Sequence, residues 1–181
     1  MDQMIVGVDS ETTGLQPPMG TRLELCPHII EIYAARRDSK TGEILEELNT
    51  LVKPPIPIPP YITKINGIND EMVKNAPTFM DIHNELFSVF LGAGEMVAAN
   101  LTFDKYMIET ELERIGKRID LPPFPFPTKN FCVIEQSMHL RWYRLKNSEL
   151  YEIATGGKIE GIHRAKADEH ATHKIYRFLK K

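Results

Sequence analysis

Apolar stretches separated by turn-forming residues mark the first third of the chain. The pattern predicts strands over residues 4–9, 28–37 and about 43–53. A turn is expected at residues 38–42, and a loop rich in proline and glycine occupies residues 14–27. Residues 54–60 contain five prolines, which cannot form a helix or a central strand. We expect an extended surface crossover there; a ligand for a proline-recognition module is the weaker alternative.

Helical periodicity dominates after residue 68. Asn69-Asp70-Glu71 has the acids of a helix start, and Thr78 with Asp81 resembles a capping box. The helix that follows carries apolar residues at positions 79, 82, 86, 89 and 90. Further helices are expected over residues 102–116, 133 to about 143, about 148–156 with Asn147 as N-cap, and about 164–179, with short strands over 96–99 and 128–132. This order predicts a single α/β domain in which helices flank a mixed sheet.

The composition is that of an ordinary globular protein. With 181 residues, 42% of them hydrophobic, the chain can build one core and is too short for two comfortable domains, so residues 1–181 are taken as one unit. Its apolar runs fall short of a membrane span, and Met1-Asp2-Gln3 lacks the features of a secretory signal. Cys26 and Cys132 alone give no disulfide framework. We therefore expect a cytoplasmic protein without membrane contact.

Charge is divided unevenly along the chain. The net charge is −3, which argues against a long electrostatic grip on duplex DNA. Residues 141–181 hold ten Lys and Arg against five Asp and Glu, a balance of +5, whereas residues 1–140 hold twelve against twenty, a balance of −8. Such a split can accompany contact with nucleic acid, although a solvated helix face is the simpler explanation of the charges alone.

Four acidic residues and one histidine suggest a specific chemistry. Asp9 and Glu11 follow an apolar stretch. With one residue between them at a strand's end, they point to the same side. Two carboxylates so placed are costly unless a cation neutralises them. With Asp104 and Asp168 they form an all-oxygen set suited to Mg²⁺ or Mn²⁺. We interpret this set, with His163 nearby in sequence, as a two-metal centre that cleaves phosphodiester bonds.

Other chemistries fit the sequence less well. Zinc ligation by His163, His170 and His173 lacks cysteine partners at a suitable spacing. Thr155-Gly156-Gly157-Lys158 lacks the first glycine and the final Ser or Thr of a phosphate-binding loop, so it is interpreted as a helix stop. A transposase or a ribonuclease H-type endonuclease would also use acids in a two-metal site. The element His-x-Ala-x-x-Asp at residues 163–168 argues against both.

Four segments resemble motifs of the DnaQ-like 3′→5′ exonucleases of the DEDDh class, which includes polymerase proofreading subunits, ribonuclease T and oligoribonuclease. They are Asp9-Ser10-Glu11-Thr12-Thr13-Gly14-Leu15, Ile65-Asn66-Gly67-Ile68-Asn69-Asp70-Glu71, Asn100-Leu101-Thr102-Phe103-Asp104 and His163-Arg164-Ala165-Lys166-Ala167-Asp168. Together they span nearly the whole chain. The resemblance implies a ribonuclease H-like fold with a five-stranded mixed sheet.

The resemblance also implies a role for each motif residue. Asp9 would bridge two divalent ions, Mg²⁺ or Mn²⁺, Glu11 and Asp168 would complete one site, and Asp104 would hold the second. His163, on the loop before the last helix, would accept the proton of the attacking water. The terminal nucleotide would be contacted by the remaining motif residues, which are Ser10, Thr12, Thr13, Leu15, Asn100 and Phe103.

Three positions depart from the family pattern. Ala99 stands where a histidine often precedes the motif asparagine, and Asn66 replaces the usual histidine of the Gly-Ile segment. Phe131-Cys132-Val133 occupies the place of a common Asp-Thr pair. None of these is an expected metal ligand, so we expect activity to survive. The departures set the chain apart from the best-known members.

The expected reaction is hydrolysis of phosphodiester bonds from the 3′ end of mainly single-stranded DNA, with release of nucleoside 5′-monophosphates. Trimming of RNA is the alternative, because nothing in the motifs reads the 2′-hydroxyl; DNA is favoured because basic clusters are confined to the C-terminal region. A non-catalytic subunit bound to a DNA polymerase is a third hypothesis. The chain ends about a dozen residues after Asp168, so such a polymerase is expected to dock on the folded surface.

Overall fold

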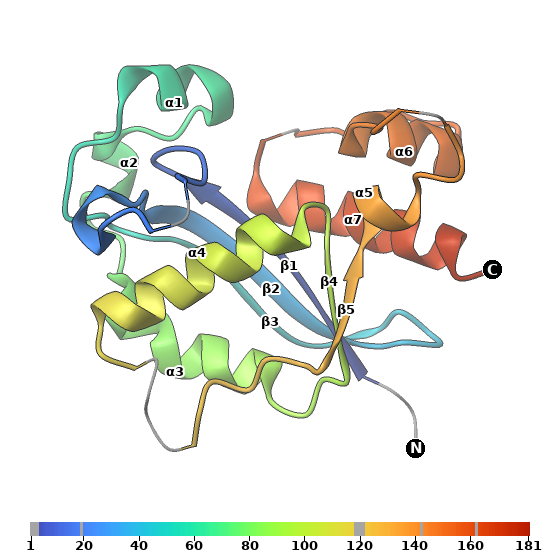
Figure 1. The fold of residues 1–181 in the computed structure, drawn as a ribbon, viewed down its shortest axis with the longest axis horizontal. Helices are drawn as coiled ribbons and strands as arrows, with labels where there is room; N and C mark the ends of the chain where they lie inside the picture. The colour runs from blue at the N-terminus through green and yellow to red at the C-terminus, as the bar shows by residue number, and fades with distance from the viewer. Residues whose placement is uncertain (1–3, 19, 118–121, 142, 162) are drawn as a thin grey trace.

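Five strands form one sheet at the centre of the protein (Figure 1). The computed structural model describes residues 4–18, 20–117, 122–141, 143–161 and 163–181. Residues 1–3, on which the expectation of no secretory signal rests, lie outside this part of the chain. The strands are Met4–Thr12 (β1), Ile29–Asp38 (β2), Ile44–Leu51 (β3), Glu95–Ala98 (β4) and Lys129–Cys132 (β5).

The sheet is mixed, as predicted. Its spatial order is β3-β2-β1-β4-β5. β1 and β2 are antiparallel, as are β2 and β3, whereas β4 runs parallel to both β1 and β5. Because β1 and β4 run in the same direction, their carboxyl ends meet at one edge of the sheet. The residues that follow these two strands are therefore neighbours.

Helices cover both faces of the sheet and confirm the single α/β domain. α3 and α4 lie on one face, and α7 lies on the other with α6 beside it (Figure 1). The helices are Pro60–Asn66 (α1), Asp70–Val73 (α2), Phe79–Phe90 (α3), Leu101–Arg114 (α4), Val133–Gln136 (α5), Asn147–Thr155 (α6) and Ala165–Leu179 (α7), with a 3-10 turn at Leu23–Leu25 (η1). No helix in the described part of the chain has both the length and the apolar character needed to cross a bilayer.

Side-chain alternation along β1 supplies both layers of the core. Val6 and Val8 are fully buried in the cluster formed with α3 and α4, whereas Ile5 belongs to the cluster formed with α7. Gly7 also lies against α7, where an added Cβ would overlap the carboxylate of Glu169. Glycine is therefore required for α7 to approach β1 this closely.

The helix starts expected at Asn69 and Thr78 are confirmed. The Asn69 side chain accepts a hydrogen bond from the Met72 amide at 3.1 Å. Thr78 and Asp81 form a complete capping box, in which each side chain accepts from the other residue's amide. The five apolar positions predicted for α3 are all buried. The 3.6-residue period therefore identified the face of α3 that packs on the sheet.

One proline was assigned wrongly. Pro60 was expected in an extended crossover that excludes helix, yet it is the first residue of α1. Proline fits this position because the first helical amides have no intrahelical partner and its φ is already that of a helix. The short helix α1 ends at Gly67, which has φ of 76°. The rest of the crossover, over residues 54–59, is irregular, as predicted.

Two expectations about the later helices were also wrong. The helix expected to reach residue 143 ends at Gln136, and the turns after it close i→i+3 bonds, such as that from Leu140 N to Ser137 O. Residue 142 lies outside the described residues. Asn147 does not cap α6, because Lys146 is the N-cap. The side-chain Nδ2 of Asn147 donates instead to Oγ1 of Thr172 on α7 at 3.3 Å.

Candidate functional site

A cleft of about 570 Å³ lies at the carboxyl ends of β1 and β4. It is bounded by the end of β1, the start of α4, the start of α6 and the loop before α7. Eight of the eleven residues that the sequence predicted for the site line it. They are Asp9, Ser10, Glu11, Asn100, Phe103, Asp104, His163 and Asp168.

Three elements carry the four acids. Asp9 and Glu11 lie on β1, which continues to Thr12. Two residues apart on a strand, they share one face of the sheet. Asp104 lies in the first turn of α4, which begins directly after β4, and Asp168 lies in the first turn of α7. The chain thus brings together acids that are 95 and 64 positions apart along it, counting from Asp9 to Asp104 and from Asp104 to Asp168.

Ser10 fixes the carboxylate of Asp104. Its hydroxyl donates to Oδ1 of Asp104 at 2.7 Å, and Asp104 is only 3% exposed. Ser10 points to the opposite side of β1 from Asp9 and Glu11, because side chains alternate along a strand. The sequence assigned Ser10 to the substrate. In the structure its hydroxyl holds a predicted metal ligand.

Asn66 orients Glu11. From the sequence it was noted only as a departure from the family pattern that is not an expected metal ligand. Its Nδ2 donates to Oε2 of Glu11 at 3.0 Å, while its Oδ1 accepts from the Ile68 amide at 3.0 Å. Both ends of this buried amide are therefore used, which fixes its orientation. The signal that could have identified it was its place in the Ile-Asn-Gly-Ile segment.

Glu31 on β2 anchors the start of α7, and sequence reasoning missed it. Its carboxylate accepts from Nε and Nη2 of Arg164, at 3.0 and 2.6 Å, and from the Ala165 amide at 3.0 Å. Glu31 is also the cross-strand partner of Glu11. The ion pair therefore fixes the backbone beside His163 relative to the strand that carries Asp9 and Glu11.

His163 occupies an unusual backbone conformation at the rim of the cleft. Its φ is 67°, and its amide donates to Oδ2 of Asp168 at 2.8 Å. A left-handed conformation costs an L-residue roughly 1–2 kcal/mol, so surrounding contacts must hold it. The side chain is exposed, and one ligand atom each of Glu11, His163 and Asp168 lie within 4.8 Å of one another.

Burial makes the carboxylates of the cleft hard to ionise. It raises the pKa of Asp9 well above its usual range, and the charges of Asp104, Asp168 and Glu11 raise it further. Burial raises the pKa of Asp104 to about 7 although Ser10 hydrogen bonds lower it, and burial is also the main cause of the raised pKa of Glu11 and Asp168. The raised pKa values of all four carboxylates show that the positive charge of the described residues does not offset the cost of their burial.

A divalent cation fits this donor set. The four acids offer only oxygen ligands, which Mg²⁺ and Mn²⁺ prefer, and a bound cation would offset the cost of their burial. Glu11, His163 and Asp168 are the only group of three close candidate ligands among the described residues. His170 and His173, weighed for zinc at the sequence level, do not join any such group in that part of the chain.

Three predicted substrate residues do not line the cleft. The Thr12 hydroxyl donates to the Gly14 carbonyl at 2.6 Å, and the Thr13 hydroxyl accepts from the His28 amide at 2.9 Å. Both threonines are buried, so their hydroxyls shape the loop itself. Leu15 is 85% exposed and belongs to the same loop. Contact of these residues with a nucleotide stays a prediction.

Six further residues line the cleft that the sequence did not assign to it. Lys146, Asn147 and Ser148 come from the start of α6, and Ile159 comes from the loop after it. Ala99 and Ile134 complete the lining. Only the packing of α6 against α7 brings its first residues to the cleft, so no local pattern could have identified them.

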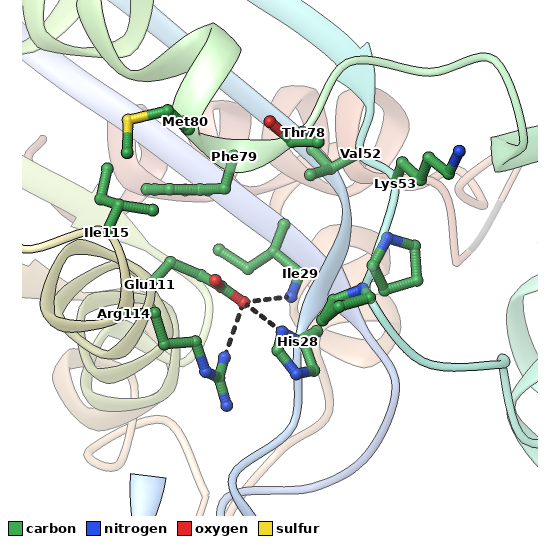
Figure 2. Close-up of a pocket in the computed structure, with 12 residues that line it drawn as sticks. His28, Ile29, Val52, Lys53, Thr78, Phe79, Met80, Glu111, Arg114 and Ile115 are labelled. Atoms are coloured by element: carbon green, nitrogen blue, oxygen red, sulfur yellow. Dashed lines mark hydrogen bonds and ion pairs between the residues drawn. The ribbon is translucent and has the colours of Figure 1, made fainter. Parts of the chain in front are cut away.

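A second cavity, of about 290 Å³, lies on the α3 and α4 side of the sheet (Figure 2). Figure 2 shows the carboxylate of Glu111, which lines the cavity, accepting from the Ile29 amide and pairing with Arg114 and His28. The His28 backbone exchanges hydrogen bonds with Thr13 on its other side. This cluster of four residues, Glu111, Arg114, His28 and Ile29, fixes the start of β2 and thereby the loop that follows β1.

Comparison with known proteins identifies the family. The exonuclease family model RNase_T matches residues 6–176. The chain belongs to this exonuclease family. Its relatives and motifs place it among the DnaQ-like 3′→5′ exonucleases, as the sequence resemblance implied.

Two relatives and one solved structure illustrate the likeness. The chain is 32% identical over 170 residues to DNA polymerase III PolC-type of Caldanaerobacter subterraneus, covering 93% of this chain and 11% of that protein. It is 31% identical over 172 residues to DNA polymerase III subunit epsilon of Treponema pallidum, covering 93% of this chain and 72% of that subunit. The chain thus spans about a tenth of the PolC-type relative.

The fold matches that of the nuclease domain of 3′hExo, a DEDDh family member solved with rAMP. The TM-score is 0.71 at 19% identity, covering 98% of this chain and 92% of that one. The expected ribonuclease H-like fold is therefore confirmed.

Proposed function

We propose that this protein is a 3′→5′ exonuclease that removes nucleoside 5′-monophosphates from the 3′ end of mainly single-stranded DNA. The observation that supports it most is the convergence of Asp9, Glu11, Asp104, Asp168 and His163 on one cleft. These residues come from three separate stretches of the chain. Because the chain belongs to an exonuclease family, a catalytic role explains why they lie in one cleft.

The four acids would hold two divalent ions, Mg²⁺ or Mn²⁺. Glu11 and Asp168 would bind one ion, Asp104 the other, and Asp9 would lie between them. When bound, the ions would lower the pKa of the attacking water and stabilise the leaving 3′-oxygen. Asn66 and Ser10 would keep the carboxylates of Glu11 and Asp104 in place as substrate enters.

His163 would act as the general base. It lies at the rim of the cleft beside Glu11 and Asp168, and its imidazole is exposed, so it can take up a proton and pass it to solvent. The Glu31–Arg164 ion pair would keep this loop close to the acids. Arg164 follows His163 directly in the chain.

The terminal nucleotide would lie against Asn100 and Phe103, which line the cleft at the start of α4. Phe103 offers an apolar face that any base can contact, so little sequence preference is expected. Leu15, exposed beside the end of β1, would contact the same nucleotide with Thr12 and Thr13.

DNA is the proposed substrate, and a DNA polymerase is the proposed partner where one exists. Both named sequence relatives are DNA polymerase III proteins, which supports this preference. Trimming of RNA is the second candidate. The structurally similar nuclease domain of 3′hExo is bound to rAMP, and nothing in the sequence motifs of this chain reads the 2′-hydroxyl that separates ribose from deoxyribose. Both cysteines are buried free thiols, in keeping with the cytoplasmic location we propose.

A degradation assay tests the proposal. A 5′-labelled single strand incubated with the protein and Mg²⁺ or Mn²⁺ should give a ladder that shortens from the 3′ end. Asp9→Asn should abolish shortening, and His163→Ala should slow it by about 10²–10⁴-fold, the usual contribution of a general base. Matched RNA and duplex substrates measured in parallel would assign the strand preference.

Glu85→Gln provides the matched control, because Glu85 is an exposed acid on α3 outside the cleft. It should degrade the strand at the wild-type rate. A wild-type protein that leaves the strand intact with every divalent metal would remove the proposal.

A further inference from the structure

A second groove adjoins the candidate catalytic cleft. It has a volume of about 600 Å³ and lies between α6, the loop that follows it and α7. Along α7 it is lined by Ala167, His170, Ala171 and Lys174, which recur at helical spacing on one face. Ile159 lines both this groove and the catalytic cleft, so the two are contiguous.

The groove is basic. Four cationic side chains line it, and Glu160 is the only acid among its lining residues in the described part of the chain. The cations are Lys158, Arg164, Lys166 and Lys174. They account for four of the ten Lys and Arg residues in the basic stretch 141–181, for which the sequence suggested either contact with nucleic acid or a solvated helix face.

Two of the four cations are neutralised by acids outside the groove. Arg164 pairs with Glu31 at 2.6 Å, and Lys166 pairs with Glu47 at 3.2 Å. The side chains of Arg164 and Lys166 are nevertheless 47% and 41% exposed, so both remain accessible at the groove surface.

The other two cations have no acidic partner among the described residues. Lys158 is exposed on the loop after α6. Lys174 donates to the phenol oxygen of Tyr151 at 3.0 Å and lies over its ring, 5.3 Å from the centroid. Two unneutralised cations in a groove that an aromatic ring also lines are a combination that single-stranded nucleic acids bind, because the cations contact phosphates and the ring contacts bases.

We propose that this groove binds the sugar–phosphate backbone of the strand on the 5′ side of the bond being cleaved. The inference rests on the proposed function, since it assigns the path of that same substrate. Lys174 lies six positions beyond Asp168 on α7, about 9 Å along the helix axis. Two to three nucleotides at roughly 3.4 Å each span that distance. Strands of about four or more nucleotides should therefore use the groove.

Binding measured without catalysis tests the groove directly. In the Asp9→Asn background, a fluorescein-labelled dT20 is titrated by anisotropy over a range of KCl concentrations. The double variant Lys158→Gln with Lys174→Gln should weaken binding about 25-fold at 0.1 M salt. It should also reduce the slope of log Kd against log salt by about 1.4, because two phosphate contacts to a single strand no longer release counterions.

A double variant elsewhere controls for net charge. Lys53→Gln with Lys129→Gln removes the same charge from two exposed positions outside both the groove and the cleft. It should keep the parental affinity and salt slope. Equal affinity and slope in the groove and control variants would overturn the proposal, whereas a difference confined to the groove variant supports it.

Catalysis separates this inference from the proposed function. With Mg²⁺, the ratio of KM for dT20 to KM for a dinucleotide should rise at least fivefold in the groove variant and stay constant in the control. If the wild-type protein cleaves both substrates and the groove variant leaves the KM ratio unchanged, the groove proposal is wrong and the proposed nuclease activity is retained. If the protein cleaves neither substrate, yet binds dT20 through Lys158 and Lys174, the proposed nuclease activity is wrong and strand binding in the groove is retained.

Discussion

At the scale of single residues, the cleft depends on side chains that hold the chemical groups in place. Asn66 orients Glu11, Ser10 orients Asp104, and Glu31 fixes the backbone next to His163 through Arg164. Each of these contacts leaves the supported carboxylate or loop with fewer accessible conformations. Mutation of such supporting residues typically lowers metal affinity or activity by about 10- to 100-fold.

Asn66→Leu should weaken metal binding by about 10- to 100-fold, because Glu11 loses its fixed donor. The Mn²⁺ concentration that half-saturates activity and the rise in Tm on adding Mn²⁺ both report this loss. Asn66→His retains a donor at this position and should recover most of the affinity. If Asn66→Leu kept the wild-type Mn²⁺ dependence in both measurements, Asn66 would have no positioning role.

His173 should make the protein less stable in mild acid. Burial lowers its pKa to about 4, with the charges of Arg37 and Arg177 adding to the effect. The unfolded chain binds this proton near pH 6.5 and the folded chain does not, so stability is lost as the pH falls from about 6.5 toward about 4. His173→Gln should flatten the fall in Tm between pH 6.5 and pH 5. His139→Gln, at an exposed histidine, should leave the fall unchanged; an equally steep fall in both variants would refute the assignment.

At the scale of elements, two contacts decide where the helices sit on the sheet. α7 lies against β1 because Gly7 leaves room for Glu169, whose carboxylate is held by Arg37 at 2.7 Å. α4 is tied to the start of β2 through Glu111, below the cavity of Figure 2. The first contact places Asp168 and the second places the loop after β1, so both act on the cleft from a distance.

Gly7→Ala should destabilise the fold by about 1–3 kcal/mol, because the new methyl group would overlap a buried carboxylate that cannot move freely. Urea unfolding followed by circular dichroism measures the change. Gly157→Ala is the control: this glycine is exposed, its added Cβ would lie 3.7 Å from the Thr155 hydroxyl, and it should cost little or stabilise slightly. Equal midpoints for the two variants would contradict the close packing of α7 on β1.

Glu111→Ala should cost about 2–3 kcal/mol, because the Ile29 amide loses its acceptor and the His28 and Arg114 side chains lose a buried carboxylate. Arg114 keeps backbone carbonyl partners, which limits the loss. The free energy of unfolding in urea checks this value. Glu109→Ala, at a half-buried position on the same helix, should change it by much less. A small effect at Glu111 would mean that the cluster does not anchor β2.

At the scale of the whole molecule, the cleft concentrates buried negative charge where the sheet and three helices meet. The four acids all have raised pKa values, so the metal-free protein carries a cost that a divalent ion removes. Positive charge is found nearby, in the groove along α7. Substrate phosphates would pass from that groove to the acids, where only bound cations make the cleft attractive to them.

Mn²⁺ should raise the Tm of the wild-type protein by about 5–10 °C at a hundredfold excess over Kd, since metal binds only the folded state. Asp104→Asn should be more stable than the wild type without metal, because it removes one buried charge and keeps an acceptor for Ser10. It should also lose most of the Mn²⁺ response. Differential scanning fluorimetry with and without EDTA measures both effects; a wild type that does not respond to Mn²⁺ or Mg²⁺ would contradict the metal assignment.

The sequence by itself determined the elements and the chemical groups. The apolar stretch over residues 4–9 predicted β1, although the strand continues to Thr12. The 3.6-residue period predicted the buried face of α3, and the capping box at Thr78 predicted its first residue. The motifs predicted the four acids and His163, because metal and proton chemistry restricts which side chains can serve. These features depend on residues close together in the chain.

Only the tertiary structure decided how those groups are held and reached. Asn66 and Glu31 support the site through contacts across 55 and 133 positions of sequence, from Asn66 to Glu11 and from Arg164 to Glu31. Asn147 fails to cap α6 for the same reason, since its side chain donates to Thr172 on α7 and this distant partner replaced the local one. Local periodicity reports which face of an element is buried, but the identity of its partner depends on long-range packing, which no pattern within a short window encodes.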